Sequence, residues 1–143
     1  MKKIFGSILL IMVLSGCSFL GEVNESIDYT EEATTHINNL SDFAENAPQM
    51  IEDAANDPAA REELASKLQT LKEEVEAFNL VDPPSIAKDI HESLVNKNEI
   101  LLDEINKVLE NGKLAVEQLE NSEIVKTINE ASDLLDRIKN IGL

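Results

Sequence analysis

Aromatic residues are scarce in this sequence of 143 residues, and tryptophan is absent. Four phenylalanines and one tyrosine make up 3% of the chain, which also has only five glycines. A β-rich fold usually needs aromatic and β-branched strands separated by turn glycines. The shortage of both argues against such a fold. Any core has to be built from aliphatic side chains, which favours helices.

Cysteine is nearly absent as well, and long hydrophobic runs are missing. Cys17 is the single cysteine, so a disulfide within the chain is excluded. The longest apolar run covers residues 4–14, eleven positions that include Gly6 and Ser7. A helix of that length measures about 16 Å, whereas the hydrocarbon core of a bilayer is about 30 Å thick. The run therefore predicts a signal peptide and not a membrane-spanning anchor.

The apolar run follows Met1-Lys2-Lys3 and ends at Leu14-Ser15-Gly16-Cys17. Positive charge, then a short apolar stretch, then small residues is the order of an export signal. A small pair directly before a lone cysteine resembles the lipobox of bacterial lipoproteins, Leu-Ser/Ala-Gly/Ala-Cys. That resemblance implies cleavage between Gly16 and Cys17 and a diacylglyceryl thioether on the Cys17 sulfur. The alternative is an ordinary signal peptide followed by a cysteine that occurs by chance.

The lipobox resemblance divides the chain into three parts. Residues 1–16 are expected to be the lipoprotein signal peptide, residues 17–24 a flexible lipid-anchored tether, and residues 25–143 an acidic helical bundle domain. Two acyl chains hold a protein on a membrane stably, whereas one does so only marginally. The expected location is therefore the extracytoplasmic face of the cell membrane, where the protein is held by lipid.

Basic residues are few, and none lies in the first third of the expected mature chain. Lysine and arginine number 12 against 28 aspartates and glutamates, a net charge of −16; without Lys2 and Lys3 it becomes −18. Residues 17–60 contain ten acidic residues, and the first basic residue after them is Arg61. Such a surface repels nucleic-acid phosphates and anionic lipid head groups. Nucleic acid is therefore not an expected partner, and the lipid has to hold the protein at the membrane.

Helical periodicity organises the remaining chain. A first helix is expected at about 23–46, with a further turn or two at 50–55. Pro48 should separate them, because proline removes a backbone donor and disfavours the helical conformation of the preceding residue. Tyr29 and Phe43 are expected near the edge of the apolar face, which comprises Val23, Ile27, Thr34, Ile37, Leu40, Ser41 and Ala44.

Asp57-Pro58 is typical of a helix start, with an N-cap acceptor followed by proline at the first helical position. The apolar residues of the second helix form a heptad seam, with alternating spacings of four and three positions: Leu64, Leu68, Leu71, Val75 and Phe78. The helix should end near the last of them. Asn98 lies on or beside the stripe of a third helix, where one polar residue can fix the register. That stripe comprises Ile86, Ile90, Leu94, Leu101, Ile105 and Val108. Asn111-Gly112 is expected to end this helix.

Residues 113–120 fit either a short helix or a packed loop. Ser122 and Glu123 are expected to start the last helix, whose stripe is Ile124, Ile128, Ala131, Leu135 and Ile138. Amphipathic segments with short connections predict an all-α antiparallel bundle of about four helices, elongated in one alternative. The seams should pack on one another within the chain. Pairing with another protein, or with a second copy as a homo-oligomer, is the alternative.

No catalytic or metal-binding motif can be found. His36 and His91 are expected to be surface or boundary residues, and neither completes a Glu-x-x-His pair because Ala33 and Lys88 stand three positions before them. Nucleophile and phosphate-binding motifs are absent from the sequence. The carboxylate groups are expected to be solvated helix faces: Glu31/Glu32, Glu52/Asp53 and Glu73/Glu74/Glu76. We therefore predict no cofactor, no metal and no enzymatic activity, only weak attraction of divalent cations.

Several short stretches together resemble a family of small lipoproteins from Gram-positive spore-forming bacteria whose function is unknown. The stretches are Gly21-Glu22-Val23-Asn24, Ser26-Ile27-Asp28-Tyr29, Phe43-Ala44-Glu45-Asn46-Ala47-Pro48, Asn56-Asp57-Pro58 and Leu119-Glu120-Asn121-Ser122-Glu123-Ile124. The resemblance covers most of the chain. It implies export, lipidation and a helical fold, and it transfers no catalytic residue.

The expected function is that of a membrane-anchored module that contacts an unknown protein partner or serves the cell envelope without catalysis. The alternative is a module that binds a small ligand or a cation in a pocket between helices. The scarcity of aromatic residues argues mildly against that alternative, because small-molecule pockets are usually lined by aromatic and apolar side chains.

Overall fold

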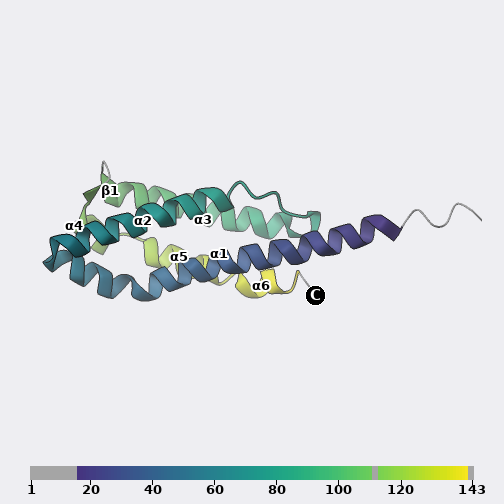
Figure 1. Ribbon diagram of the computed structural model, residues 1–143, viewed down its shortest axis with the longest axis horizontal. Helices are drawn as coiled ribbons and strands as arrows, with labels where there is room; N and C mark the ends of the chain where they lie inside the picture. The colour runs from purple at the N-terminus through teal and green to yellow at the C-terminus, as the bar shows by residue number, and fades with distance from the viewer. Residues whose placement is uncertain (1–15, 111–112, 142–143) are drawn as a thin grey trace, which may run out of the picture.

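The computed structural model describes residues 16–110 and 113–141, and the side chains from residue 24 onward. Its elements are α1 (Gly16–Asn56), α2 (Pro58–Phe78), the 3₁₀ turn η1 (Ser85–Ala87), α3 (Lys88–Val108), β1 (Leu109–Glu110), β2 (Lys113–Leu114), α4 (Val116–Glu120), α5 (Ile124–Ser132) and α6 (Leu135–Lys139). Successive long helices run in opposite directions, and α5 packs against both α1 and α3 (Figure 1). The predicted all-α bundle is confirmed, and it is elongated.

The second helix forms as its sequence predicts. Asp57 has an extended backbone, with φ −127° and ψ 120°, and its Oδ1 accepts the backbone N–H of Ala59 at 2.9 Å. Pro58 follows at the start of the helix, where its missing N–H costs nothing. All five predicted seam residues are buried, and the last of them, Phe78, ends the helix.

Replacing Asp57 by alanine should lower the free energy of unfolding by about 1 kcal/mol, because the N–H of Ala59 loses its acceptor. Asp57→Asn should cost much less, since asparagine caps a helix about as well as aspartate. Urea unfolding followed by circular dichroism measures both. Equal losses in the two variants would show that the cap does not act through this hydrogen bond.

The first helix passes through Pro48, so the expected break at that residue is wrong. α1 is continuous over 41 residues with Pro48 inside it. Pro48 is exposed, whereas Ala47 before it and Ala54 after it are buried. The ring therefore lies on the solvent side, and burial on both sides of the proline offsets the one backbone hydrogen bond that it removes. The ribbon of α1 curves over its last turns (Figure 1).

The buried face of α1 differs from the predicted one. Ile27 is 48% exposed, whereas Tyr29, expected at the edge, is 3% exposed. The buried residues are Tyr29, Ala33, Ile37, Leu40, Ala44, Ala47 and Ala54. The stripe is rotated toward Tyr29 because α1 packs against α2 and α5 at the same time.

The helix also extends further toward the N-terminus than expected. The backbone of residues 16–24 is helical, and the assignment of residues 17–24 as a lipid-anchored tether stays a prediction. Helix propagation adds a hydrogen bond per residue at little cost once the packed turns exist, and the single Gly21 does not stop it. The first turns of α1 project past the other helices (Figure 1).

The second half of the chain differs from the prediction at Ile86, in part of the segment 113–120, and in the last helix. Ile86 is 69% exposed in η1, and Ala87 is buried instead. The segment 113–120 contains both β2, paired with β1 in a two-stranded hairpin (Leu109 opposite Leu114), and the short helix α4. Asn111-Gly112, the predicted stop of the third helix, lies outside the described residues; α3 ends at Val108.

The predicted last helix is divided into α5 and α6 by a tight turn, in which Leu134 N–H donates to the Ala131 carbonyl at 3.1 Å.

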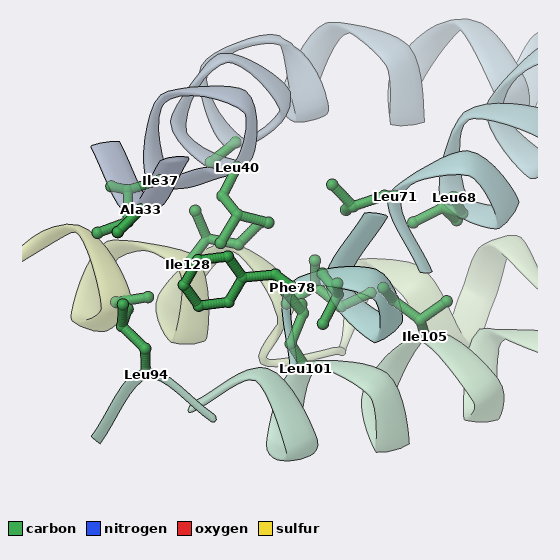
Figure 2. Close-up of a cluster of buried hydrophobic side chains, with 14 of the residues drawn as sticks. Ala33, Ile37, Leu40, Leu68, Leu71, Phe78, Leu94, Leu101, Ile105 and Ile128 are labelled. Atoms are coloured by element: carbon green, nitrogen blue, oxygen red, sulfur yellow. The ribbon is translucent and has the colours of Figure 1, made fainter. Parts of the chain in front are cut away.

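One aliphatic core runs through the bundle, and it explains why the helices assemble. Figure 2 shows Ala33, Ile37 and Leu40 of α1 facing Leu94 and Leu101 of α3, with Phe78 of α2 between them. The predicted seams therefore pack on one another within the chain. Burial of each leucine or isoleucine stabilises the fold by about 1.5–3 kcal/mol.

Candidate functional site

The lipobox residues lie at or beyond the start of the described chain. Leu14 and Ser15 fall outside the described residues. Gly16 and Cys17 begin α1, and only their backbone is described. The lipidation of Cys17 and the cleavage before it therefore stay predictions. If they hold, the projecting end of α1 carries the anchor.

Both histidines are buried, so the prediction of surface or boundary positions is wrong. His36 is 7% exposed and His91 is 6% exposed. They lie on different helices, α1 and α3, and both contact the ring of Phe78 at the end of α2. His36 stacks on that ring with centroids 4.1 Å apart and planes 3° apart, and His91 lies 5.4 Å away at 42°.

Two hydrogen bonds of the same pattern link α1 to α3. Tyr29 Oη and His91 Nδ1 are 3.2 Å apart, and so are His36 Nε2 and Asn98 Oδ1. Each pair is separated by 62 residues, and each helix contributes residues seven positions apart. Asn98, only 1% exposed, also donates from Nδ2 to Asn79 Oδ1 at 2.8 Å. Asn98 is predicted to lie on or beside the buried stripe, and its burial confirms this.

The hydrogen bond with Asn98 shows which ring nitrogen of His36 carries a hydrogen. The amide oxygen of Asn98 can only accept, so His36 Nε2 carries a hydrogen and donates it. Burial lowers the pKa of His36 below its usual 6.5, although the Asn98 hydrogen bond acts in the opposite direction. Burial also lowers the pKa of His91, against the attraction of Asp82, Glu32 and Glu92. Both histidines are therefore mainly neutral at pH 7, because burial makes the charged imidazolium costly.

Tyr29 joins this cluster to the molecular surface. It lines a pocket of about 350 Å³ with Glu25, Asp28, Glu32, Val81, Asp82, Pro83 and Pro84. Burial, and secondarily the charge of Glu32, raises the pKa of Tyr29 to about 12, so the phenol stays neutral. Among the described residues, no group of three or more His, Cys, Asp or Glu side chains is placed to hold a metal ion. The predicted solvated carboxylates on α1 and α2 are all exposed.

A second feature is a groove of about 540 Å³ between α1 and α2. It has a partly apolar floor and polar walls, and it is lined by Asn39, Asp42, Phe43, Asn46, Gln49, Met50, Ser66, Lys67, Thr70, Leu71 and Glu74. The sequence reasoning missed it, although Asn39, Phe43, Asn46 and Met50 repeat at steps of four, three and four. That spacing predicts a stripe beside the buried face, without showing whether another helix covers it.

No helix in the described part of the chain is both long enough and apolar enough to cross a membrane. Three features of the described chain could take part in an activity: the buried histidine cluster, the pocket beside Tyr29 and the groove between α1 and α2. The histidine cluster is packed and hydrogen-bonded within the core, so its evident role is structural. The groove is accessible and is large enough for a partner.

Comparisons with known proteins agree with the sequence resemblance. Residues 29–141 match the model of a family of unknown function, DUF6376. The chain is 32% identical over 135 residues to the uncharacterized lipoprotein YybP of Bacillus subtilis (strain 168), a match that covers 92% of this chain and 91% of the relative. None of the solved structures matches the chain significantly. The chain thus belongs to the family of unknown function DUF6376.

Proposed function

We propose that this protein is a lipoprotein held on the extracytoplasmic face of the cell membrane by a diacylglyceryl group on Cys17. Residues 1–16 act as its signal peptide, and residues 25–143 form a module that contacts another envelope protein without catalysis. The observation that carries the proposal is the Leu14–Cys17 lipobox. A relative aligned over 92% of the chain is named a lipoprotein, which supports it.

The charge of the protein makes the lipid necessary. The expected mature chain carries a net charge of −18, so anionic head groups repel it. Two acyl chains provide stable anchoring, at about 0.8 kcal/mol per buried methylene group. Contact with a protein is favoured over binding of a small ligand because the groove between α1 and α2 is open to solvent. Sites for small ligands, in contrast, usually enclose the ligand and bury about 70–90% of its surface.

Replacing Cys17 by alanine tests the anchor. The wild-type protein should fractionate with membranes, resist alkaline washing, and show by mass spectrometry a chain that begins at acylated Cys17. Cys17→Ala should lack the lipid and either remain as the uncut precursor or leave the membrane. Ser18→Ala is the matched control and should behave as the wild type. A wild-type chain with a free thiol, or a cleaved Cys17→Ala chain that stays on the membrane, would contradict the proposal.

A further inference from the structure

The groove between α1 and α2 has the dimensions of a helix-binding site. The stripe on α1 extends from Asn39 to Met50, a length of about 16 Å, or three helical turns. The stripe on α2 steps by four and three through Lys67, Leu71 and Glu74. Two parallel stripes at this spacing form the kind of seam into which the side chains of a third helix fit.

The floor of the groove is partly apolar, with three apolar side chains among its lining residues. Leu71 is 4% exposed and belongs to the core, while Phe43 and Met50 pack against the core and remain partly accessible. Phe43 and Met50 are seven residues apart, so they present two anchoring positions on one face of α1. Methionine is unbranched and adapts to different partner side chains. The floor can therefore accept an apolar stripe with residues at positions i, i+3 or i+4, and i+7.

The walls of the groove are polar, and their charged side chains are two carboxylates and one lysine. Asp42 on α1 and Glu74 on α2 are exposed, and α1 contains no lysine or arginine along its whole length. Lys67 is the cation among the lining residues, and its Nζ lies 3.1 Å from Glu63 Oε1. A second copy of this chain would bring another strongly negative surface to the groove. An anionic lipid surface is repelled for the same reason. Charge complementarity therefore selects a basic occupant.

We propose that the α1–α2 groove binds a basic amphipathic helix of another protein. Its apolar stripe lies on Phe43, Met50 and Leu71, and its lysine or arginine side chains lie beside Asp42 and Glu74. This inference rests on the proposed function, because it names the surface and the class of partner through which the lipoprotein acts.

Two synthetic helical peptides with the same leucine stripe provide the probe. Each is about fourteen residues long, or four turns; one carries lysines beside the stripe and the other glutamates. The full lipidated chain in neutral detergent micelles should bind the lysine peptide at least about tenfold more tightly, and added salt should reduce the difference. Equal affinity for the two peptides, or no binding of either, would overturn the inference.

A charge exchange in the groove makes the test specific to this surface. The double variant Asp42→Lys and Glu74→Lys should prefer the glutamate peptide; both side chains are exposed, so the fold should be kept. The matched control, Glu99→Lys with Glu110→Lys, places two lysines at exposed positions that do not line the groove and should keep the wild-type preference. The same reversal in both double variants would show that total charge, and not the groove, selects the peptide.

The apolar floor is tested separately. Met50→Ser should weaken binding of the lysine peptide, whereas Ile100→Ser, at an exposed position on α3, should leave it unchanged. Urea unfolding of both variants identifies any loss that is due to destabilisation. An unchanged affinity in a folded Met50→Ser variant would overturn the assignment of the floor.

Photocrosslinking in cells separates this inference from the proposed function. A benzophenone amino acid in place of Phe43 should crosslink to a basic helical segment of another protein, and the same probe at Ile100 should not. Crosslinks from position 43 to lipid or to a second copy of the chain would overturn the inference. Protein crosslinks from position 100 alone would overturn the groove assignment and retain the contact function. An absence of protein crosslinks from probes placed over the whole exposed surface would overturn both.

Discussion

Replacing Phe78 by alanine should lower the free energy of unfolding by about 3–5 kcal/mol, the range for deletion of a buried aromatic ring. Phe78 is 4% exposed and ends α2, and its ring lies against His36 of α1 and His91 of α3. Removing it opens a cavity at the point where three helices meet. Since a domain of this size is stable by about 5–15 kcal/mol in total, the loss should be evident in urea unfolding.

Phe43→Ala is the matched control, because it is the same substitution at a phenylalanine that is less buried than Phe78. Phe43→Ala removes a ring that lines the α1–α2 groove and is only partly buried, so it should cost about 1–2 kcal/mol. Phe78→Leu should fall between the two alanine variants, since it keeps most of the volume and loses the ring stacking, worth about 0.5–1.5 kcal/mol. Equal losses in the two alanine variants would show that Phe78 does not hold the helices together.

The elements that the sequence predicts well are those whose signals are local. The second helix begins at Asp57-Pro58 and ends at Phe78 as expected, since a capping side chain and a heptad seam are both properties of a few neighbouring residues. Asn98 lies on the buried stripe as expected, because it shares the spacing of Leu94 and Leu101. The fold class follows from the same periodicity.

The histidine cluster cannot be predicted in the same way. Burial of His36 and His91 depends on which faces of α1, α2 and α3 meet, and that is decided by packing between segments about 60 residues apart. One signal is present: Tyr29 and His36 are seven residues apart, and so are His91 and Asn98. Such matched spacing indicates that two helices could pair their polar residues, but it does not show which helices are neighbours.

Pro48 and the hairpin show how tertiary packing overrides local preference. Proline usually ends a helix, yet α1 continues through it because Ala47 and Ala54 are buried on either side of the exposed ring. Asn111-Gly112 is typical of a helix stop, but Asn-Gly is also a frequent sequence for a two-residue hairpin turn. β1 and β2 pair on either side of those residues. A helix stop and a hairpin turn differ in where the segment after Gly112 lies in space. A single sequence does not show that location.

Acidification from pH 7.5 to 5 should destabilise the fold through its two histidines. Burial lowers the pKa of His36 and His91 below 6.5, so between each folded pKa and 6.5 the unfolded chain binds more protons than the folded one. Stability is then fully present above pH 6.5 and is lost as the pH falls toward the folded pKa values. The slope is up to about 1.4 kcal/mol per pH unit for each histidine. Urea unfolding at several pH values measures this slope.

Glu104 and Glu130 do not produce this change, because their effect lies at lower pH. Hydrogen bonds from Lys107 and Lys97 lower the pKa of Glu104 and Glu130 below 4.5, so the stability that they contribute is lost only under more acidic conditions. The double variant His36→Gln with His91→Gln should therefore be less stable at pH 7.5 and nearly independent of pH between 7.5 and 5. If it kept the wild-type slope, groups other than the two histidines would control the acid response, and the neutral core around Phe78 would not be its cause.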